Sequence, residues 1–153
     1  MLHAESWGSP GWLRVLLVDG DDNDRALFGV AVERSDLDVW LSTLGDADEA
    51  VKYLHGHERY ADRALHPLPE LIVLGLRLPT MSGLEFLEWR RSSPVAREIP
   101  VAIFSGFPHP RDLEVARSLG AELCLAKPLA FGEFVEAVCQ LLQFGLEKRR
   151  QPC

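Results

Sequence analysis

The stretch that decides the fold is "ELIVLGLRLPTMSGLEF", residues 70–86. Its apolar run Leu71–Leu74 is typical of a strand buried on both faces, and the run ends at Gly75. A turn that contains Pro79 and Gly83 follows and leads into a helix-like segment. Because an open α/β sheet binds its ligands beyond the carboxyl ends of its strands, the glycine at this strand end needs an explanation.

The same alternation of strand and helix runs along the whole chain. Apolar runs predict five strands, at Leu13–Asp19, Leu37–Leu41, Leu71–Leu74, Pro100–Ser105 and Leu123–Ala126. Helix-like runs separate them, with apolar residues three or four positions apart. Strand and helix repeated five times require parallel pairing with right-handed crossovers. The pattern therefore predicts an α/β fold with a doubly wound sheet.

Local signals refine two of these helices. Pro110 is suited to a first turn and Gly120 to a stop, which predicts a helix with Leu113 and Ala116 on its apolar face. The helix expected after Gly83 carries Phe86 and Trp89 three residues apart, but Arg90 interrupts its apolar stripe.

Length and composition indicate one domain. The 153 residues fit a single domain, expected at 13–147, with an N-terminal tail at 1–12 and a C-terminal tail at 148–153. The net charge of −7 argues against non-specific nucleic-acid binding, which needs a basic face. No apolar run approaches the roughly 18 residues of a membrane span, and the N-terminus lacks a signal-peptide pattern. The three cysteines have no metal-ligand spacing, so we expect reduced thiols in a cytoplasmic protein.

Chemistry-bearing residues follow several of the expected strands. The first strand is followed by "DGDDND", residues 19–24, and the last two by Ser105 and Lys127. From local sequence alone, Asp21, Asp22 and Asp24 are candidates to cap the next helix.

With these positions, the chain resembles a receiver domain of a two-component response regulator over roughly residues 13–145. The motifs "LLVDGDD", "LIVLGLRLPTMSGLEFL", "IPVAIFSG" and "LGAELCLAKP" occur in the order of that family. The resemblance implies a (βα)5 flavodoxin-like, CheY-like fold with strand order 2-1-3-4-5. It also implies phosphoryl transfer to an aspartate after the third strand, with Mg²⁺ held by that aspartate and two acids after the first strand.

When the roles of the family's site residues are assigned to the matching positions of this chain, the chain resembles a degenerate member of the receiver family. The phospho-acceptor position is Gly75, which has no side chain to phosphorylate, and the acid pair is Asp19 and Gly20. We therefore expect no catalytic residue and no enzymatic activity. Mg²⁺ binding should be lost or weak, with Asp19 and Asp21 as the remaining candidate ligands.

Three other family positions are Ser105 and Lys127, which match the family's hydroxyl and lysine, and Cys124, which replaces the aromatic switch residue. We expect Asp19 and Lys127 to neutralise each other without metal. The Lys127–Pro128 peptide bond, often cis in this family, is a candidate for the cis form.

These features predict a stand-alone pseudo-receiver that acts by protein–protein interaction in phosphorelay signalling. Its partner would be a sensor histidine kinase or a downstream signalling protein, and the 110–146 face is a candidate homodimer surface. The long segment 55–70 resembles that of single-domain regulators that partner phytochrome-type kinases. Two alternatives stay open: a regulator phosphorylated on Asp21 or Asp19, and an anion or small-molecule sensor at Ser105 and Lys127.

Overall fold

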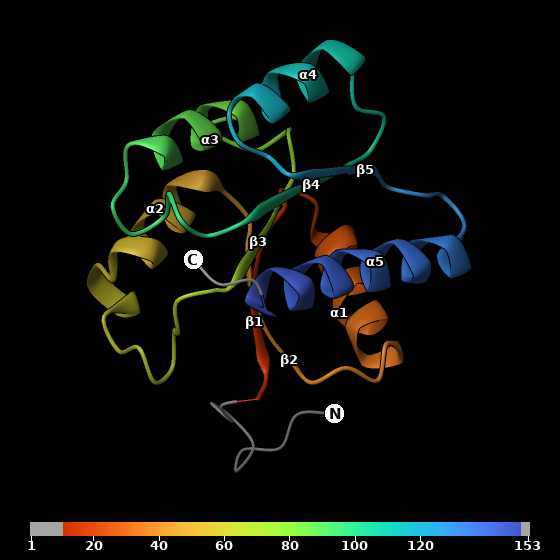
Figure 1. Cartoon of the computed structure of the whole chain (residues 1–153), viewed down its shortest axis with the longest axis horizontal. Helices are drawn as coiled ribbons and strands as arrows, with labels where there is room; N and C mark the ends of the chain where they lie inside the picture. The colour runs from red at the N-terminus through yellow and green to blue at the C-terminus, as the bar shows by residue number, and fades with distance from the viewer. Residues whose placement is uncertain (1–10, 151–153) are drawn as a thin grey trace.

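The computed structural model describes residues 11–150, and within them five parallel strands form one sheet (Figure 1). The strands are β1 (Leu13–Val18), β2 (Val39–Leu44), β3 (Leu71–Leu74), β4 (Val101–Ser105) and β5 (Leu123–Ala126). Their order is β2-β1-β3-β4-β5, so the fold class and strand order expected from the sequence are confirmed.

Helices follow the strands in alternation and cover both faces of the sheet. They are α1 (Asp22–Arg34), α2 (Ala47–His55), α3 (Gly83–Arg91), α4 (Pro110–Ser118) and α5 (Phe131–Arg150), with a short 3-10 helix η2 (Glu58–Tyr60) after α2. Figure 1 shows α1 and α5 side by side on one face, and α2, α3 and α4 on the other. Within residues 11–150 no helix is long and apolar enough to cross a membrane.

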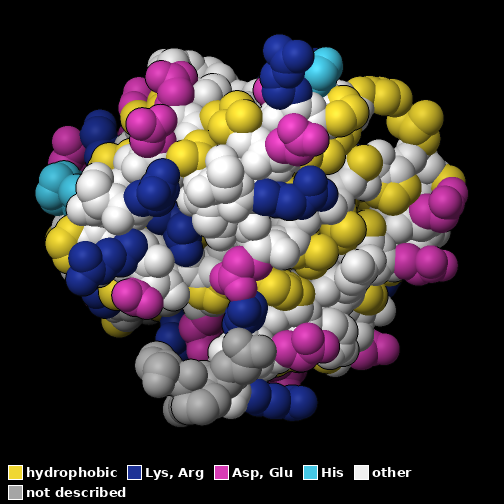
Figure 2. Space-filling view, turned by 45° about the horizontal axis from the view of Figure 1, so that its top comes forward, with side chains coloured by type: hydrophobic (Ala, Val, Ile, Leu, Met, Phe, Trp, Pro, Cys, Tyr) yellow, Lys and Arg dark blue, Asp and Glu magenta, His cyan; other side chains and the backbone are white. Residues whose placement is uncertain are grey.

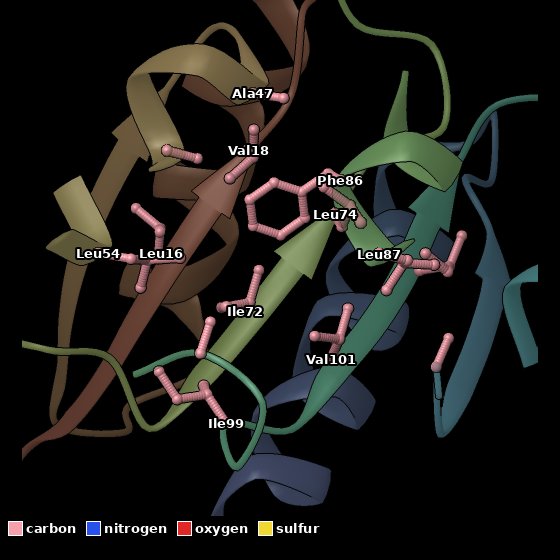
Figure 3. Close-up of a cluster of buried hydrophobic side chains, with 14 of the residues drawn as sticks. Leu16, Val18, Ala47, Leu54, Ile72, Leu74, Phe86, Leu87, Ile99 and Val101 are labelled. Carbon is pink, nitrogen blue, oxygen red and sulfur yellow. The ribbon is translucent and has the colours of Figure 1, made fainter. Parts of the chain in front are cut away.

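Alternation along the strands builds two apolar layers. Leu13, Val15 and Leu17 of β1 pack toward α1 and α5, where Phe28 and Val138 join them. The intervening β1 residues point the other way, into the second layer. Figure 3 shows that layer, in which Leu16, Val18, Ile72 and Leu74 meet Phe86 and Leu87 of α3. Because β1, β3 and β4 lie in the middle of the sheet, they are apolar on both faces, as the sequence indicated.

The second strand was predicted wrongly. The sequence analysis placed it at Leu37–Leu41, whereas β2 runs from Val39 to Leu44. β2 is an edge strand that is only partly buried, so its last residues, Ser42 and Thr43, did not produce a continuous apolar signal.

The expected end of the domain also shifts. Helix α5 continues to Arg150, three residues beyond the predicted domain end at 147. The Arg149 guanidinium bonds the Glu70 carboxylate and donates to the carbonyl oxygens of Gly11, at 3.0 Å, and Trp12, at 2.6 Å. These bonds tie the end of α5 to the start of β1. The remainder of the two predicted tails, residues 1–10 and 151–153, lies outside the described residues.

Arg90, which broke the apolar stripe of α3, has a structural role. Its side chain is only 7% exposed, and it donates to the carbonyl oxygen of Ile99 at 2.7 and 3.0 Å and to that of Arg97 at 3.2 Å. Burial lowers the pKa of the Arg90 guanidinium below its usual range. Arg90 therefore connects the loop before β4 to α3. Its hydrogen bonds satisfy the buried carbonyl groups of that loop.

The β3–α3 turn brings the start of α3 against the end of β3. Ser82 caps the helix through a reciprocal pair of hydrogen bonds with Glu85. The Gly83 amide donates to the Leu76 carbonyl at 2.9 Å. A Cβ on Gly83 would lie 2.3 Å from the Gly75 carbonyl oxygen, so only glycine permits this approach.

This close approach predicts a large asymmetry between two glycine substitutions. We expect Gly83→Ala to lower the free energy of unfolding by about 2–3 kcal/mol, because the methyl group collides with backbone that cannot move aside. Gly29→Ala, in the middle of α1 with no atom within 4 Å of the added Cβ, should raise it by about 0.5–1 kcal/mol. Urea unfolding of both variants beside the wild type measures the difference, and equal effects would contradict this account of the turn.

Candidate functional site

A pocket of about 680 Å³ lies at the carboxyl ends of β1, β3, β4 and β5. It brings together most of the site residues expected from the sequence, which follow β1, β3, β4 and β5. Its lining includes Asp19, Gly20, Asp21, Asp24, Gly75, Arg77, Ser82, Ser105, Phe107 and Lys127. The parallel topology produces this convergence, because the carboxyl ends of parallel strands meet at one edge of the sheet.

The centre of the site is the Lys127 ammonium group. Its Nζ lies 2.6 Å from Asp19 Oδ2 and 2.6 Å from Asp24 Oδ2. The side chains of Asp19 and Lys127 are only 6% and 13% exposed, so the pair is screened from water. The expected pairing of Asp19 with Lys127 is confirmed, and Asp24 is a second partner that the sequence did not identify.

The charges around Lys127 set its protonation. Burial alone would lower the pKa of the ammonium group, but hydrogen bonds to Asp19 and Asp24 and their negative charges outweigh it. The net result is a raised pKa for Lys127. Lysine is therefore held in its charged form by the two carboxylates.

The remaining acids after β1 are engaged in local structure. Of the three predicted capping residues, only Asp21 is the N-cap of α1, where it accepts from the Asp24 amide at 3.0 Å. Asp24 instead pairs with Lys127. Asp19 Oδ1 accepts from the Asp21 amide at 2.9 Å. Asp22 is paired with Arg25, whose guanidinium also donates to the Asp19 carbonyl at 2.6 Å. The loop is thus held in place by its own hydrogen bonds.

Gly75 and Gly20 differ in the space around them. A Cβ built on Gly75 would first meet the Val18 carbonyl oxygen at 3.6 Å, which is an ordinary contact. A Cβ on Gly20 would lie 3.3 Å from both the Arg77 carbonyl oxygen and Pro79 Cδ. The β3–α3 turn that carries these atoms would therefore have to shift slightly. The site therefore has room for a side chain at position 75 and a tighter fit at position 20.

Ser105 and Cys124 lie where the sequence placed them. Ser105 ends β4, is buried and lines the pocket. Cys124 lies in β5, half-buried, and burial raises the pKa of its thiol, which favours the unreactive protonated form. The Lys127–Pro128 peptide bond, a candidate for the cis form, is trans, as are the other peptide bonds of residues 11–150.

The donor set does not fit a Mg²⁺ ion. Magnesium requires several hard oxygen ligands, and a receiver supplies three carboxylates for it. Here two of the three positions are glycine, and Asp19 is already bonded to Lys127. Among the described residues, no group of three or more His, Cys, Asp or Glu side chains is placed to hold a metal.

Comparison with known proteins agrees with the fold. A sequence model of the response regulator receiver domain matches residues 15–139. The chain is 30% identical over 138 residues to a probable methanogenesis regulatory protein, FilR2, of Methanothrix harundinacea, covering 90% of this chain and 86% of that protein.

Two solved structures extend the comparison. The phosphorylated cyanobacterial phytochrome response regulator RcpA superimposes with a TM-score of 0.82 at 26% identity, covering 93% of this chain and 99% of the other. The bacteriophytochrome response regulator RtBRR superimposes with a TM-score of 0.70 at 34% identity, covering 85% and 78%. In both, the similarity extends over most of the two chains.

The buried triad of charges leads to a stability prediction. We expect Lys127→Met to lower the free energy of unfolding by about 2–4 kcal/mol at neutral pH, because it leaves two carboxylates close together without their cation. Lys52→Met, which removes a more exposed lysine paired with Glu49 and Glu58, is the matched control and should cost less than about 1 kcal/mol.

The pH dependence has a defined sign. A raised lysine pKa stabilises the fold below the unfolded-state value of about 10.5, and the contribution disappears as the pH rises through the folded-state pKa. The difference between wild type and Lys127→Met should therefore be constant near neutral pH and shrink in alkali. Chemical unfolding at a series of pH values measures it, and a difference that grows in alkali would rule out this pairing.

Proposed function

Because this chain belongs to the response regulator receiver domain family, we propose that it is a pseudo-receiver, which acts in two-component signalling by binding other proteins. Receiver domains are in general signalling modules rather than enzymes, and we assign no enzymatic activity to this one. Its signal would pass through contacts between proteins without phosphorylation of an aspartate. We place this activity in the cytoplasm, with no nucleic-acid or membrane partner.

One observation carries the proposal. The acceptor position is Gly75, and the lysine that would neutralise an incoming phosphoryl group is already bound by Asp19 and Asp24. In an active receiver, the nucleophile is a carboxylate that forms an acyl phosphate. This site has no nucleophile at that position, and its cation is neutralised within the protein.

The two alternatives have less support. Phosphorylation of Asp19 would require it to release Lys127 and the Asp21 amide, and phosphorylation of Asp21 would remove the cap of α1. Neither residue follows β3. An anion at Ser105 and Lys127 would have to displace two carboxylates that already bind the ammonium group.

Apolar side chains exposed beside the site support a protein partner. Phe107, 78% exposed, and Leu129, 87% exposed, border a hollow of about 380 Å³ with Leu27 and Phe131. In Figure 2 hydrophobic side chains gather at the right-hand side, where Figure 1 places the connection from β5 to α5. Exposed apolar groups gathered in one area are typical of interaction surfaces.

We assign the partner by chemistry and by similarity. A sensor histidine kinase or a downstream signalling protein would contact this surface, and the 110–146 face would serve a homodimer. The similarity to RcpA and RtBRR, which are described as phytochrome and bacteriophytochrome response regulators, favours a phytochrome-type kinase among these.

The first test is direct phosphorylation. The protein is incubated with Mg²⁺ and a small phosphoramidate donor beside an active receiver, and its intact mass is measured. We expect the control to gain a phosphoryl group and this protein to remain unmodified. A labile phosphoryl group on the wild-type protein would overturn the proposal, and peptide mapping would then begin with Asp19 and Asp21.

Restoring the carboxylates should restore the chemistry. Gly75→Asp supplies the nucleophile in a position with free space, and Gly20→Asp adds the second metal ligand in a tighter one. We expect the double variant to accept a phosphoryl group from the same donor in the presence of Mg²⁺, and Gly20→Asp alone to remain unmodified. If the correctly folded double variant also stays unmodified, the loss of activity has a cause other than the two glycines.

A further inference from the structure

The sheet has two edge strands among the described residues, β2 and β5, and β2 carries one of its two free edges. Among the described strands β2 pairs only with β1, so its other side has no strand beside it. Its sequence, "VWLSTL", contains no charged residue and no proline. Charges, proline and bulges are the usual devices that prevent another strand from adding to an edge. This edge lacks the first two.

Hydrogen bonds to β1 show which backbone groups point outward. The Asp38 carbonyl accepts from the Leu13 amide at 2.9 Å, and the Leu44 carbonyl accepts from the Asp19 amide at 3.0 Å. Successive residues of a strand direct their backbone groups to opposite sides. The amide and carbonyl groups of Val39, Leu41 and Thr43 therefore point away from β1, toward the free edge.

A hollow lies beside this edge on each face of the sheet. On the α2 side, about 390 Å³ is lined by Trp40, Leu44, Tyr53, Tyr60 and Leu65, among others. On the α1 side, about 540 Å³ is lined by Val39 and Leu41 together with residues of α1 and the α1–β2 loop. A strand added to the edge would place successive side chains alternately into the two hollows.

The two hollows differ in chemistry. The rings of Tyr53, Tyr60 and His66 pack with centroids 5.2–5.8 Å apart on the α2 side, which suits an apolar side chain. Arg59 also lines this hollow, and its charge is paired with Glu49. The α1 side carries Glu33, Asp36 and Asp38, and no lysine or arginine is among its lining residues. A lysine or arginine there would lay its aliphatic stem along apolar groups and bring its charge to the carboxylates.

We propose that the free edge of β2 docks an extended segment of a partner protein in which arginine or lysine alternates with apolar residues. Main-chain hydrogen bonds to Val39, Leu41 and Thr43 would supply affinity, and the two hollows would select the side chains. This surface is separate from the pocket around Lys127, and the proposal does not depend on whether that pocket accepts phosphate.

A second copy of this chain fits the edge less well. In antiparallel self-pairings centred on Leu41 or on Ser42, Asp46 just after β2 of one copy would come near Asp36 or Asp38 just before β2 of the other, according to the register. Like charges directly opposite each other destabilise a strand pair. The net charge of −7 adds a general repulsion between copies. A strand with basic side chains can form the same main-chain hydrogen bonds to the edge of β2 without this charge repulsion.

The test uses a seven-residue peptide of alternating valine and arginine, blocked at both ends, and the full chain labelled with ¹⁵N. We expect chemical-shift changes at the amides of Val39, Leu41 and Thr43, and weaker binding at high salt. Two matched peptides serve as controls: one with alternate amides N-methylated, and one with glutamate in place of arginine. Both should bind at least about tenfold more weakly.

Protein variants complete the test. Thr43→Pro removes the backbone amide of residue 43, which points away from β1, and leaves the hydrogen bonds between β2 and β1 in place. Thr43→Ala is its control. Glu33→Gln with Asp38→Asn removes two surface charges and should weaken the peptide about tenfold without changing the melting temperature. This charge variant keeps the proposal testable if Thr43→Pro does not fold.

Three outcomes would overturn the proposal. The first is no binding of the valine–arginine peptide up to millimolar concentration. The second is equal binding of the N-methylated peptide, or shift changes confined to the surface around Phe107 and Leu129. The third is a dimer of the free protein that Thr43→Pro abolishes, because that result assigns the edge to a second copy.

Discussion

The buried ammonium group of Lys127 holds the carboxyl edge of this sheet together. It joins the end of β5 to Asp19 at the end of β1 and to Asp24 in the first turn of α1, 103 residues earlier in the chain. Asp19 and Asp24 both lie 2.6 Å from the Lys127 Nζ, and without this cation their carboxylates would repel each other strongly. The lysine compensates the charges of both carboxylates within the protein.

The site keeps the fold of a receiver, and glycine occupies the position that corresponds to the phospho-acceptor. The β3–α3 turn, with Gly83 against the Gly75 carbonyl and the Ser82 cap, positions the strand end as it would be positioned for catalysis. Space for a side chain remains at position 75. Preserved architecture around a missing nucleophile explains why a family match and a proposal of lost phosphorylation are compatible. The surfaces proposed for function are the one where Phe107 and Leu129 are exposed and the side of β2 that faces away from β1, where no described strand pairs with it.

Sequence reasoning was reliable where a residue's neighbours along the chain determine its environment. The central strands, the Asp21 cap and the first-turn proline of α4 follow from local patterns, and the structure contains each of them. Sequence reasoning was less reliable at the edge of the sheet and at the end of the domain. The edge strand β2 was displaced toward its apolar residues. The domain end was expected at 147, within the last turn of α5, where Arg149 is charged yet bonded to Glu70.

The sequence by itself determined the order of strands and helices, because apolar patterns encode it directly. Its motifs also carried the resemblance to receivers, which implies that Gly75 stands at the acceptor position. Only the tertiary structure decided that Asp24 shares Lys127, that Arg90 binds the carbonyl groups before β4, and that two hollows flank the edge of β2. The physical reason is that these contacts join residues distant in sequence. Their partners are chosen by the parallel packing of the sheet, which no local pattern specifies.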